Sequence, residues 1–259
     1  MKLMGVVNVT PDSFSDGGLF LDADAAIAHG EELVRDGAEI VDVGGESTRP
    51  GADEVSAAEE VARTESVVAG LATAVTVSID TSKLAVAEAA LGAGASIVND
   101  VTALRAAPEI AGLCADRGAD LVLMHMQGDP RTMQADPRYD DVVDDVKAFL
   151  AERLQAAIDA GVEEERVWLD PGIGFGKALE HNLELLRRLG ELRELGRPLV
   201  VGTSRKSFIG KVDGSEVGDR LGGTIASSVL AAAEGADVLR VHDVAEARQA
   251  LRVASAILG

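Results

Sequence analysis

Short apolar segments alternate with longer amphipathic segments eight times along this chain of 259 residues. The apolar segments are continuous runs rich in Val, Ile and Leu, which are typical of parallel strands buried on both faces. They occupy residues 3–8, 39–44, 75–80, 96–99, 121–125, 167–170, 199–202 and 238–241. This eightfold repeat constrains the fold more strongly than any other feature of the sequence.

The intervening segments have the period of a helix. In one of them Val143, Val146, Leu150, Leu154 and Ile158 recur at steps of three and four residues and form one apolar stripe. Helices are predicted over residues 24–36, 55–72, 83–91, 108–117, 139–160, 183–195, 216–234 and 244–258. Five glycines stand where a helix needs a left-handed final residue, namely Gly37, Gly94, Gly118, Gly161 and Gly235.

Eight units of strand followed by helix predict one α/β domain over residues 1–259, folded as a single (β/α)8 TIM barrel. A length of about 250 residues is typical of that barrel. An open, doubly wound sheet is the structural alternative, because it is built from the same units.

The chain has 44 acidic and 24 basic residues, a formal net charge of −20. This charge disfavours binding to nucleic acid or to anionic membranes, and an anionic substrate would need a local basic pocket. Only six basic residues are Lys, so adaptation to high salt and a GC-rich genome both stay open as explanations. A lone cysteine, Cys114, and the lack of a visible signal peptide or membrane span predict a cytoplasmic protein.

Polar residues follow the predicted strands, at the end where a TIM barrel carries its active site. They are Asn8, Glu46, Asp80, Asn99, His125, Asp170, Lys206, Arg240 and His242. Any one of them would be explained as a loop cap or a rim group. Their recurrence at equivalent places around the barrel predicts a functional site.

Asp80, Asn99 and Asp170 each complete an apolar run. Their two carboxylates and one amide could bind the N–H donors on the edge of a flat heterocycle. Carboxylates also bind hard cations, so a metal site is the rival interpretation.

Arg49, Lys206, Arg240 and His242 supply positive charge at the ends of three strands. In an acidic protein such a cluster could neutralise a phosphate or a diphosphate. The segment 202–207 adds hydroxyl and backbone N–H groups near the place where many barrels bind phosphate.

Two other patterns are not expected to be functional sites of their apparent kind. The segment 171–177 looks like a phosphate-binding loop, but Gly172 to Gly176 is one residue too short for a Walker A motif, and Ala178 replaces the required Ser or Thr. The four histidines show neither close pairing nor a cysteine partner, which disfavours a structural zinc site.

Taken together, these segments resemble dihydropteroate synthase from residue 4 to the last helix. The most distinctive motifs are residues 4–18, MGVVNVTPDSFSDGG, and residues 42–51, DVGGESTRPG. Shorter matches lie at residues 78–81, 98–100, 124–127, 170–177, 202–207 and 240–243. The resemblance implies condensation of p-aminobenzoate with 6-hydroxymethyl-7,8-dihydropterin diphosphate in folate biosynthesis, and a target of sulfonamides.

The resemblance also implies roles for individual residues. Asp80, Asn99, Asp170 and Lys206 would bind the pterin, with Met124 packed nearby. Carboxylates at these positions would also stabilise the pterin-methyl cation that forms when diphosphate leaves. The aniline nitrogen of p-aminobenzoate would then attack it directly, so no protein nucleophile is needed.

Arg240, His242 and Asn8 would surround the diphosphate, with Asn8 also contacting Mg²⁺, the implied cofactor. The p-aminobenzoate pocket would be formed by Thr48, Arg49, Pro50, Phe14, Phe175 and Ser204. Catalysis would depend mainly on Lys206, Arg240, His242 and Arg49. Segments 8–18 and 44–52 would close over the substrates and exclude water.

A homodimer is expected from the same resemblance. The chain starts close to the first strand, and residues 211–218 diverge, so the barrel floor and a dimer contact could differ from the family pattern. Two other functions stay open: a methyltransferase domain with a related pterin site, and a paralogue that binds pterin without turnover.

Overall fold

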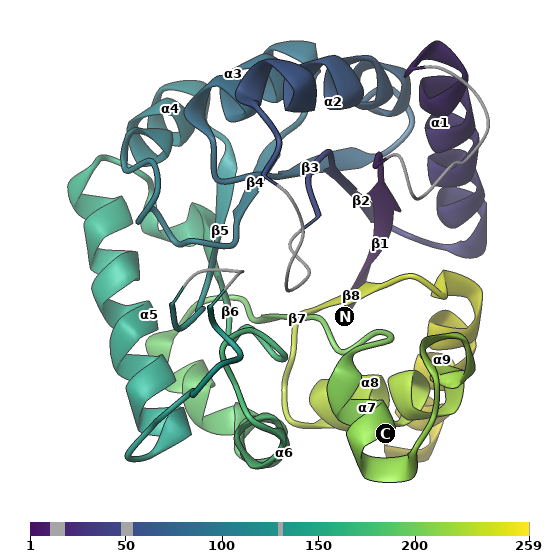
Figure 1. The fold of residues 1–259 in the computed structure, drawn as a ribbon, viewed down its shortest axis with the longest axis vertical. Coiled ribbons are helices and arrows are strands. Elements are labelled where there is room, and N and C mark those ends of the chain that lie inside the picture. The colour runs from purple at the N-terminus through teal and green to yellow at the C-terminus, as the bar shows by residue number, and fades with distance from the viewer. Residues whose placement is uncertain (11–18, 48–53, 129–131, 259) are drawn as a thin grey trace.

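The computed structural model describes residues 1–10, 19–47, 54–128 and 132–258, and its strands form a ring surrounded by helices (Figure 1). The eight strands are parallel and follow the order β6-β5-β4-β3-β2-β1-β8-β7. A bridge between Leu169 and Leu199 joins β6 to β7, and the N–H of Leu169 donates to the carbonyl of Pro198 at 2.9 Å. The sheet is therefore a closed (β/α)8 barrel, as predicted, and the open sheet is excluded.

The strands lie within one residue of their predicted ends. They are β1 Lys2–Asn8, β2 Ile40–Gly44, β3 Thr76–Asp80, β4 Ile97–Asp100, β5 Asp120–Met124, β6 Val167–Asp170, β7 Val200–Val201 and β8 Val238–Val241. Five glycines predicted to end helices have positive φ, for example 111° at Gly94 and 59° at Gly118. A side chain with a Cβ would be strained there, which explains why glycine occupies these positions.

Most outer helices also lie close to the predicted segments. They are α1 Leu19–Asp36, α2 Ala57–Leu71, α3 Leu84–Ala93, α4 Glu109–Arg117, α5 Val142–Asp159, α6 Leu179–Arg187, α7 Ser207–Asp213, α8 Leu221–Ala233 and α9 Val244–Leu258. Short 3₁₀ segments are η1 Glu164–Arg166, η2 Leu189–Leu195 and η3 Val217–Asp219. None of the described helices is long and apolar enough to cross a membrane.

The predictions differ from the structure in two helical regions. The single helix predicted over residues 183–195 is two elements, α6 and η2, which meet at Arg188. Helix α7 was not predicted, because seven residues are too few to show a period, and the helix predicted over 216–234 begins only at Leu221. The diverged residues 211–218 thus form the end of α7 and part of η3.

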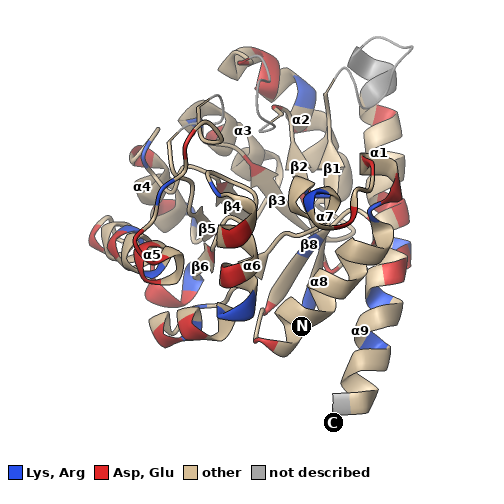
Figure 2. Ribbon diagram, turned by 60° about the horizontal axis from the view of Figure 1, so that its bottom comes forward, with Lys and Arg blue, Asp and Glu red and all other residues tan. Residues whose placement is uncertain are grey.

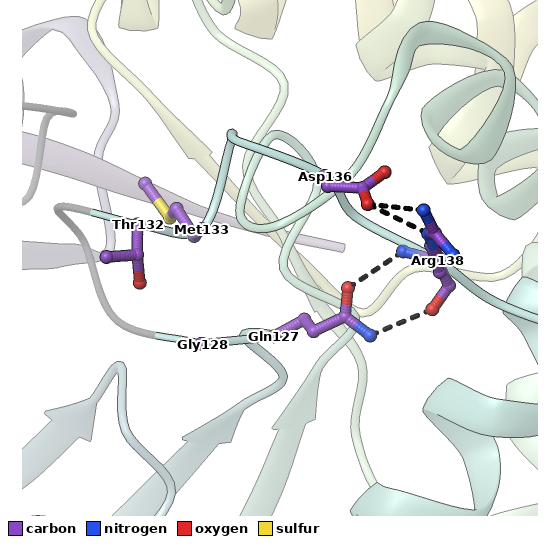
Figure 3. A pocket seen from close by; sticks show the side chains of 6 residues that line it. All are labelled: Gln127, Gly128, Thr132, Met133, Asp136 and Arg138. Carbon is purple, nitrogen blue, oxygen red and sulfur yellow. Dashed lines mark hydrogen bonds and ion pairs between the residues drawn. The ribbon is translucent and has the colours of Figure 1, made fainter.

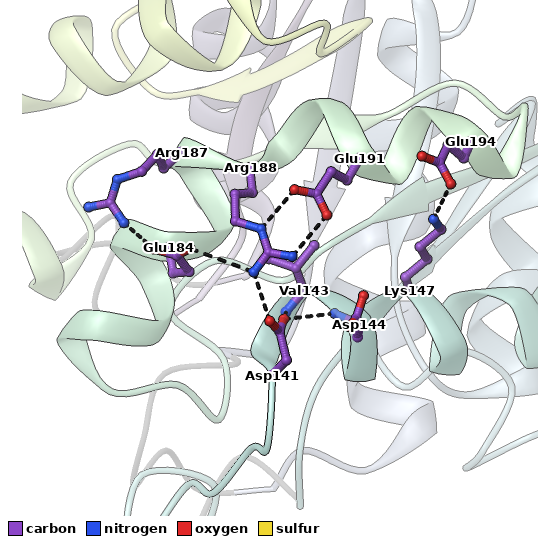
Figure 4. Close-up of polar contacts among 9 residues, drawn as sticks. All are labelled: Asp141, Val143, Asp144, Lys147, Glu184, Arg187, Arg188, Glu191 and Glu194. Carbon is purple, nitrogen blue, oxygen red and sulfur yellow. Dashed lines mark hydrogen bonds and ion pairs between the residues drawn. The ribbon is translucent and has the colours of Figure 1, made fainter.

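A partly exposed charge network joins α5 to the break between α6 and η2 (Figure 4). Arg188 Nη1 donates to Asp141 Oδ2 at 2.8 Å, and its other nitrogens bind both carboxylate oxygens of Glu191 at 2.7 and 2.9 Å. Asp141 also caps α5 by accepting from the N–H groups of Val143 and Asp144. The network fixes how these elements meet, although partly exposed ion pairs add little to stability.

Two layers of inward-facing side chains fill the barrel. Residues near the amino ends of the strands form an apolar layer, called the lower layer here: Met4, Ile40, Ile97, Val122, Trp168, Val200 and Val238. The ammonium of Lys2 lies 5.8 Å from the centre of the Trp168 ring. A larger apolar cluster separates the outer face of the sheet from the helices.

Every second residue of a strand points to the same face. On four of these strands the next inward-facing side chain is polar. Ile40 is followed by Asp42, Ile97 by Asn99, Trp168 by Asp170 and Val238 by Arg240. Together with Asp80 at the end of β3, these polar side chains form the upper layer. The acidic surface of the outer helices lies on the other side of the sheet (Figure 2).

Candidate active site

The upper layer is connected by hydrogen bonds around Arg240. Its Nε donates to Asp42 Oδ2 at 2.6 Å, and its Nη2 donates to Asp80 Oδ2 at 2.8 Å. Asn99 Nδ2 donates to the same Asp42 oxygen at 3.0 Å. Strand pairing sets this arrangement, because Asp80 lies opposite Asn99 in the register of β3 and β4. A guanidinium, an amide and two carboxylates therefore meet inside the barrel.

Burial changes the protonation of these carboxyl groups. It raises the pKa of Asp80 to about 7; Arg240 opposes this shift, and the nearby carboxylates of Asp42, Glu60 and Asp100 reinforce it. Burial also raises the pKa of Asp170, although Lys206 nearby has the opposite effect. Both carboxylates thus gain by binding a ligand that supplies N–H donors.

Lys206 approaches the same space from the start of α7. Its Nζ donates to the carbonyl of Ile173 and lies 4.7 Å from the centre of the Phe175 ring. Burial lowers the pKa of Lys206 to about 8, although Asp170 favours its charged form. A flat aromatic ligand could lie against Phe175 within reach of this ammonium.

The loop after β6 owes its glycines to close packing. Gly172 has φ of 66°, and a Cβ there would lie 1.9 Å from the carbonyl oxygen of His125. Gly174 has φ of 85°, and a Cβ there would lie 3.1 Å from Lys206 Cδ. These glycines let the loop lie on the backbone of residue 125 and make room for Lys206.

Lys177, at the end of this loop, points into the protein. Its side chain is fully buried, and its Nζ lies 2.8 Å from His125 Nδ1 and donates to the carbonyl of Phe175 at 2.9 Å. Burial lowers the pKa of Lys177 and lowers that of His125 to about 2. The His125 ring packs against Phe149 of α5, so His125 supports the loop from behind.

The loop after β7 brings Ser204 next to His242. Ser204 Oγ lies 2.9 Å from His242 Nδ1 and accepts from the backbone N–H of His242 at 3.2 Å. The neighbouring Arg205 has φ of 58°, and its guanidinium binds both carboxylate oxygens of Asp243. These contacts fix a hydroxyl and an imidazole at the ends of β7 and β8.

An apolar wall lies beside the network, formed by Val101, Met124, Met126 and Met133 with Phe175 packed against it. Behind Met133 a hollow of about 250 Å³ opens in the loop after β5, lined by Gln127, Gly128, Thr132, Met133, Asp136 and Arg138 (Figure 3). The side chain of Gln127 closes this loop by bonding both the N–H and the carbonyl of Arg138.

The comparisons with known proteins agree with this geometry. A family model described as "Pterin binding enzyme" matches residues 4–242. The dihydropteroate synthase of Escherichia coli is 46% identical over 258 residues, which cover 99% of this chain and 91% of that protein. This chain belongs to the dihydropteroate synthase family.

Solved structures of the family superpose closely. A Xanthomonas albilineans dihydropteroate synthase with 4-aminobenzoic acid has a TM-score of 0.94 and 47% identity, covering 100% of this chain and 93% of that chain. A second structure from the same organism, in complex with 7,8-dihydropteroate, has a TM-score of 0.90 and 44% identity, covering 100% and 94%. The chain is thus an enzyme of the transferase class, and the methyltransferase and binding-only alternatives are not favoured.

The structure brings together most of the residues predicted for the dihydropteroate synthase site. Asp80, Asn99 and Arg240 share one hydrogen-bond network with Asp42, Asp170 lies near Lys206, and Ser204 contacts His242. Phe14, Thr48, Arg49 and Pro50 lie outside the described residues.

Asp42 belongs to this network but was not predicted as a site residue. It is the only charged residue in the run Ile40–Gly44, and a carboxylate inside an apolar strand was the available signal. Glu46, predicted for the mouth, instead binds Lys83 at 2.8 Å and the N–H of Val55 at 2.8 Å. Lys83 also binds the buried Glu60 at 2.6 Å, so Glu46 joins the start of the second loop to α2 and α3.

The position of the Asn8 side chain is compatible with its predicted role as a magnesium ligand. A Cβ on Gly44 would lie 3.9 Å both from Asn8 Oδ1 and from Asp80 Oδ2, so the two oxygens lie on the same side of Gly44. Oxygen donors of this kind suit Mg²⁺, which commonly takes its remaining ligands from substrate phosphates and water. Among the described residues no group of three or more His, Cys, Asp or Glu could hold a metal without such help.

Proposed function

We propose that the protein condenses p-aminobenzoate with 6-hydroxymethyl-7,8-dihydropterin diphosphate, giving 7,8-dihydropteroate and diphosphate. The observation that carries the proposal is the upper layer, where acceptors meet a partly buried guanidinium. Asp80, Asn99 and Asp170 suit the N–H donors of a pterin. Arg240 supplies positive charge beside them in a protein with a net charge of −20.

The diphosphate would lie toward Arg240, His242 and Asn8. Arg240 is held by Asp42 and Asp80, and these carboxylates outweigh burial and raise its pKa, so it stays charged. Mg²⁺, with Asn8 as one ligand, would supply further charge neutralisation to the leaving diphosphate. Neutralising the leaving group lowers the barrier to breaking its C–O bond.

The reaction would then need correct orientation of the two substrates and exclusion of water, and it would not need a nucleophilic side chain. The methylene C–O bond breaks, and the electron pair leaves with diphosphate. The lone pair of the aniline nitrogen forms the new C–N bond, and that nitrogen loses a proton. Ionised Asp80 and Asp170 would stabilise the positive charge that builds on the pterin, and the buried upper layer would limit competition by water.

The p-aminobenzoate ring would lie between Phe175 and the first two loops. Lys206 and Ser204 are within the same region, and the proximity of Lys206 to the Phe175 ring suits a flat, anionic substrate. By resemblance, Phe14, Thr48, Arg49 and Pro50 would complete this pocket, and sulfonamides would compete for it.

A diphosphate-release assay tests the proposal directly. With both substrates and Mg²⁺ present, diphosphate and dihydropteroate should appear in equal amounts. Omitting p-aminobenzoate, the pterin diphosphate or Mg²⁺ should each reduce dihydropteroate formation to background. Release of diphosphate without dihydropteroate, at the same rate with and without p-aminobenzoate, would refute the proposed transfer.

We also propose a cytoplasmic homodimer. Large exposed apolar side chains lie on α7, η3 and α8, namely Val212, Val217, Leu221 and Leu230. Such side chains on neighbouring elements suit contact with a second copy. Sedimentation equilibrium should give twice the 26.8 kDa chain mass, and Leu230→Glu should shift it toward the monomer. A monomer at all concentrations tested would contradict this.

A further inference from the structure

Asp42 lies beneath the proposed substrate site and has no exposed surface. One of its oxygens, Oδ2, accepts from Arg240 Nε at 2.6 Å and from Asn99 Nδ2 at 3.0 Å. A single carboxylate oxygen therefore connects the amide of the pterin site with the guanidinium of the diphosphate site. Being fully buried, Asp42 acts through these two neighbours.

The contact with Asp42 fixes which end of the Asn99 amide faces the ligand. An ionised carboxylate only accepts hydrogen bonds, so the NH₂ group of Asn99 must face Asp42. The carbonyl oxygen of Asn99 is then on the side of the amide that faces away from Asp42. All three side chains of the pterin site thereby offer acceptors, and the site selects a ligand edge that carries N–H donors.

The same carboxylate fixes the plane of the Arg240 guanidinium. Asp42 holds Nε and Asp80 holds Nη2, so the planar group has two anchors on different strands. Nη1 has no hydrogen-bond partner among the described residues and is available to an anion. Without Asp42, one anchor and the counter-charge below Arg240 would both be lost.

The other oxygen of Asp42 indicates that this carboxylate is not placed for stability. Oδ1 is buried and makes no hydrogen bond within the described part of the chain. A buried charge with an unsatisfied oxygen costs stability, and an apolar residue would fill the space more favourably. The benefit must therefore lie in what Asp42 does for Asn99 and Arg240.

We propose that Asp42 is a positioning residue that sets the polarity of the Asn99 amide and the orientation of the Arg240 guanidinium, so that one site recognises both a donor-rich heterocycle and its diphosphate. The identity of the ligand rests on the proposed function. The geometry of Asp42, Asn99 and Arg240 stands without it.

The test is calorimetric titration of wild type, Asp42→Asn and the matched control Ser78→Ala. Ser78 is also fully buried, lies opposite Asp42 in the register of β2 and β3, and has a hydroxyl without a hydrogen bond in the described residues. The ligands are 6-hydroxymethyl-7,8-dihydropterin, its diphosphate, and inorganic diphosphate. Asp42→Asn should weaken binding of the pterin alcohol about tenfold and binding of inorganic diphosphate by a similar factor. The affinities of Ser78→Ala should stay within about twofold of those of wild type.

A double-mutant cycle separates positioning from general loss of structure. Once Asp42→Asn has freed the Asn99 amide, adding Asn99→Ala should cost less than Asn99→Ala costs in wild type. Additive losses, or Asp42→Asn affinities equal to those of Ser78→Ala, would overturn the inference. Failure of wild type to bind any pterin would instead count against the proposed function.

A second measurement needs no variant at position 42, in case that substitution prevents folding. In the NMR spectrum of the free protein, one side-chain N–H of Asn99, assigned by its loss in Asn99→Ala, should exchange slowly with solvent. Rapid exchange of both amide protons, as for a solvated asparagine, would show that Asp42 does not hold the amide.

Discussion

The lower and upper layers of the barrel interior are built on the same strands, but the lower layer is apolar and the upper layer is polar and charged. Ile40, Ile97 and Val238 of the lower layer fill space with apolar groups, whereas Asp42, Asn99 and Arg240 lie two residues further along and carry polar groups. The lower layer gains free energy by burial. The upper layer gives some of it up, because charges are held away from water until a ligand can bind them.

Along a single strand, the residue in the lower layer therefore serves stability and the residue in the upper layer serves ligand recognition. A change in the lower layer should leave a cavity and weaken the fold. A change in the upper layer should leave the fold but remove recognition. The raised pKa of Asp80 and Asp170 is a physical sign of that division, because it arises from burial of groups that would be ionised in water.

The largest expected effect comes from removing a carboxylate of the upper layer. Asp80→Ala or Asp170→Ala should abolish detectable binding of the pterin diphosphate, because N–H donors of the ligand would lose their acceptors. The fold should remain, since neither carboxylate belongs to the apolar layer. Calorimetric titration together with circular dichroism measures both. Affinity like that of wild type in both variants would refute the pterin assignment.

A smaller effect is expected at Arg49, which lies outside the described residues. Arg49→Ala should reduce kcat/KM for p-aminobenzoate by about a hundredfold or more; a hundredfold is equivalent to about 2.7 kcal/mol in the transition state. Pterin diphosphate binding without p-aminobenzoate should change less, because Asp80 and Asp170 lie deeper. Arg49→Lys should recover little if the contact is bidentate. Steady-state kinetics within about threefold of wild type for Arg49→Ala would show that this residue acts as a solvated charge.

The protonation of Asp80 should appear in the pH dependence of stability. Its pKa is raised from 3.8 to about 7, so between these values the folded protein holds a proton that the unfolded chain has released. This contribution to stability is complete below about pH 4 and is lost as the pH rises through about 7. Compared with wild type, Asp80→Asn should lose that downward trend in melting temperature between pH 4 and 8. Parallel profiles for the two proteins would contradict a raised pKa.

The smallest expected effect concerns the outer surface. If the net charge of −20 is an adaptation to salt, molar KCl should raise the melting temperature by screening repulsion between acidic side chains. Thermal unfolding at low and at molar KCl measures this. A melting temperature that is unchanged or lower in KCl would favour the genomic explanation of the composition and leave the site unaffected.

Much of the fold could be predicted because its signals are local. Apolar runs marked the strands to within one residue, and glycines such as Gly94 and Gly118 marked the helix ends. Strand ends then indicated Asp80, Asn99 and Arg240, because parallel strands deliver their carboxyl ends to one mouth. Helix α7 was missed because seven residues are too few to show a helical period.

The remaining features depend on whether a side chain points into the barrel or toward the helices. The positions of the strand ends alone do not reveal this. Asp42 required the knowledge that β2 places it inward, between Asn99 and Arg240. His125 ends an apolar run as Asp170 does, yet its ring packs against Phe149, and Lys177 turns inward to meet it. The hydrogen bonds among these contacts join residues 52 to 198 positions apart, and the ring contact joins residues 24 apart, so no local pattern encodes them.

Paired substitutions on β4 test the division between the layers most directly. Ile97→Ala should lower the free energy of unfolding by about 2–5 kcal/mol and leave the dissociation constant of the pterin diphosphate within about threefold of wild type. Asn99→Ala should weaken that binding by at least about tenfold with little loss of stability. Denaturant unfolding and calorimetric titration of both variants give the four values. Equal losses of stability and of affinity in the two variants would contradict the account.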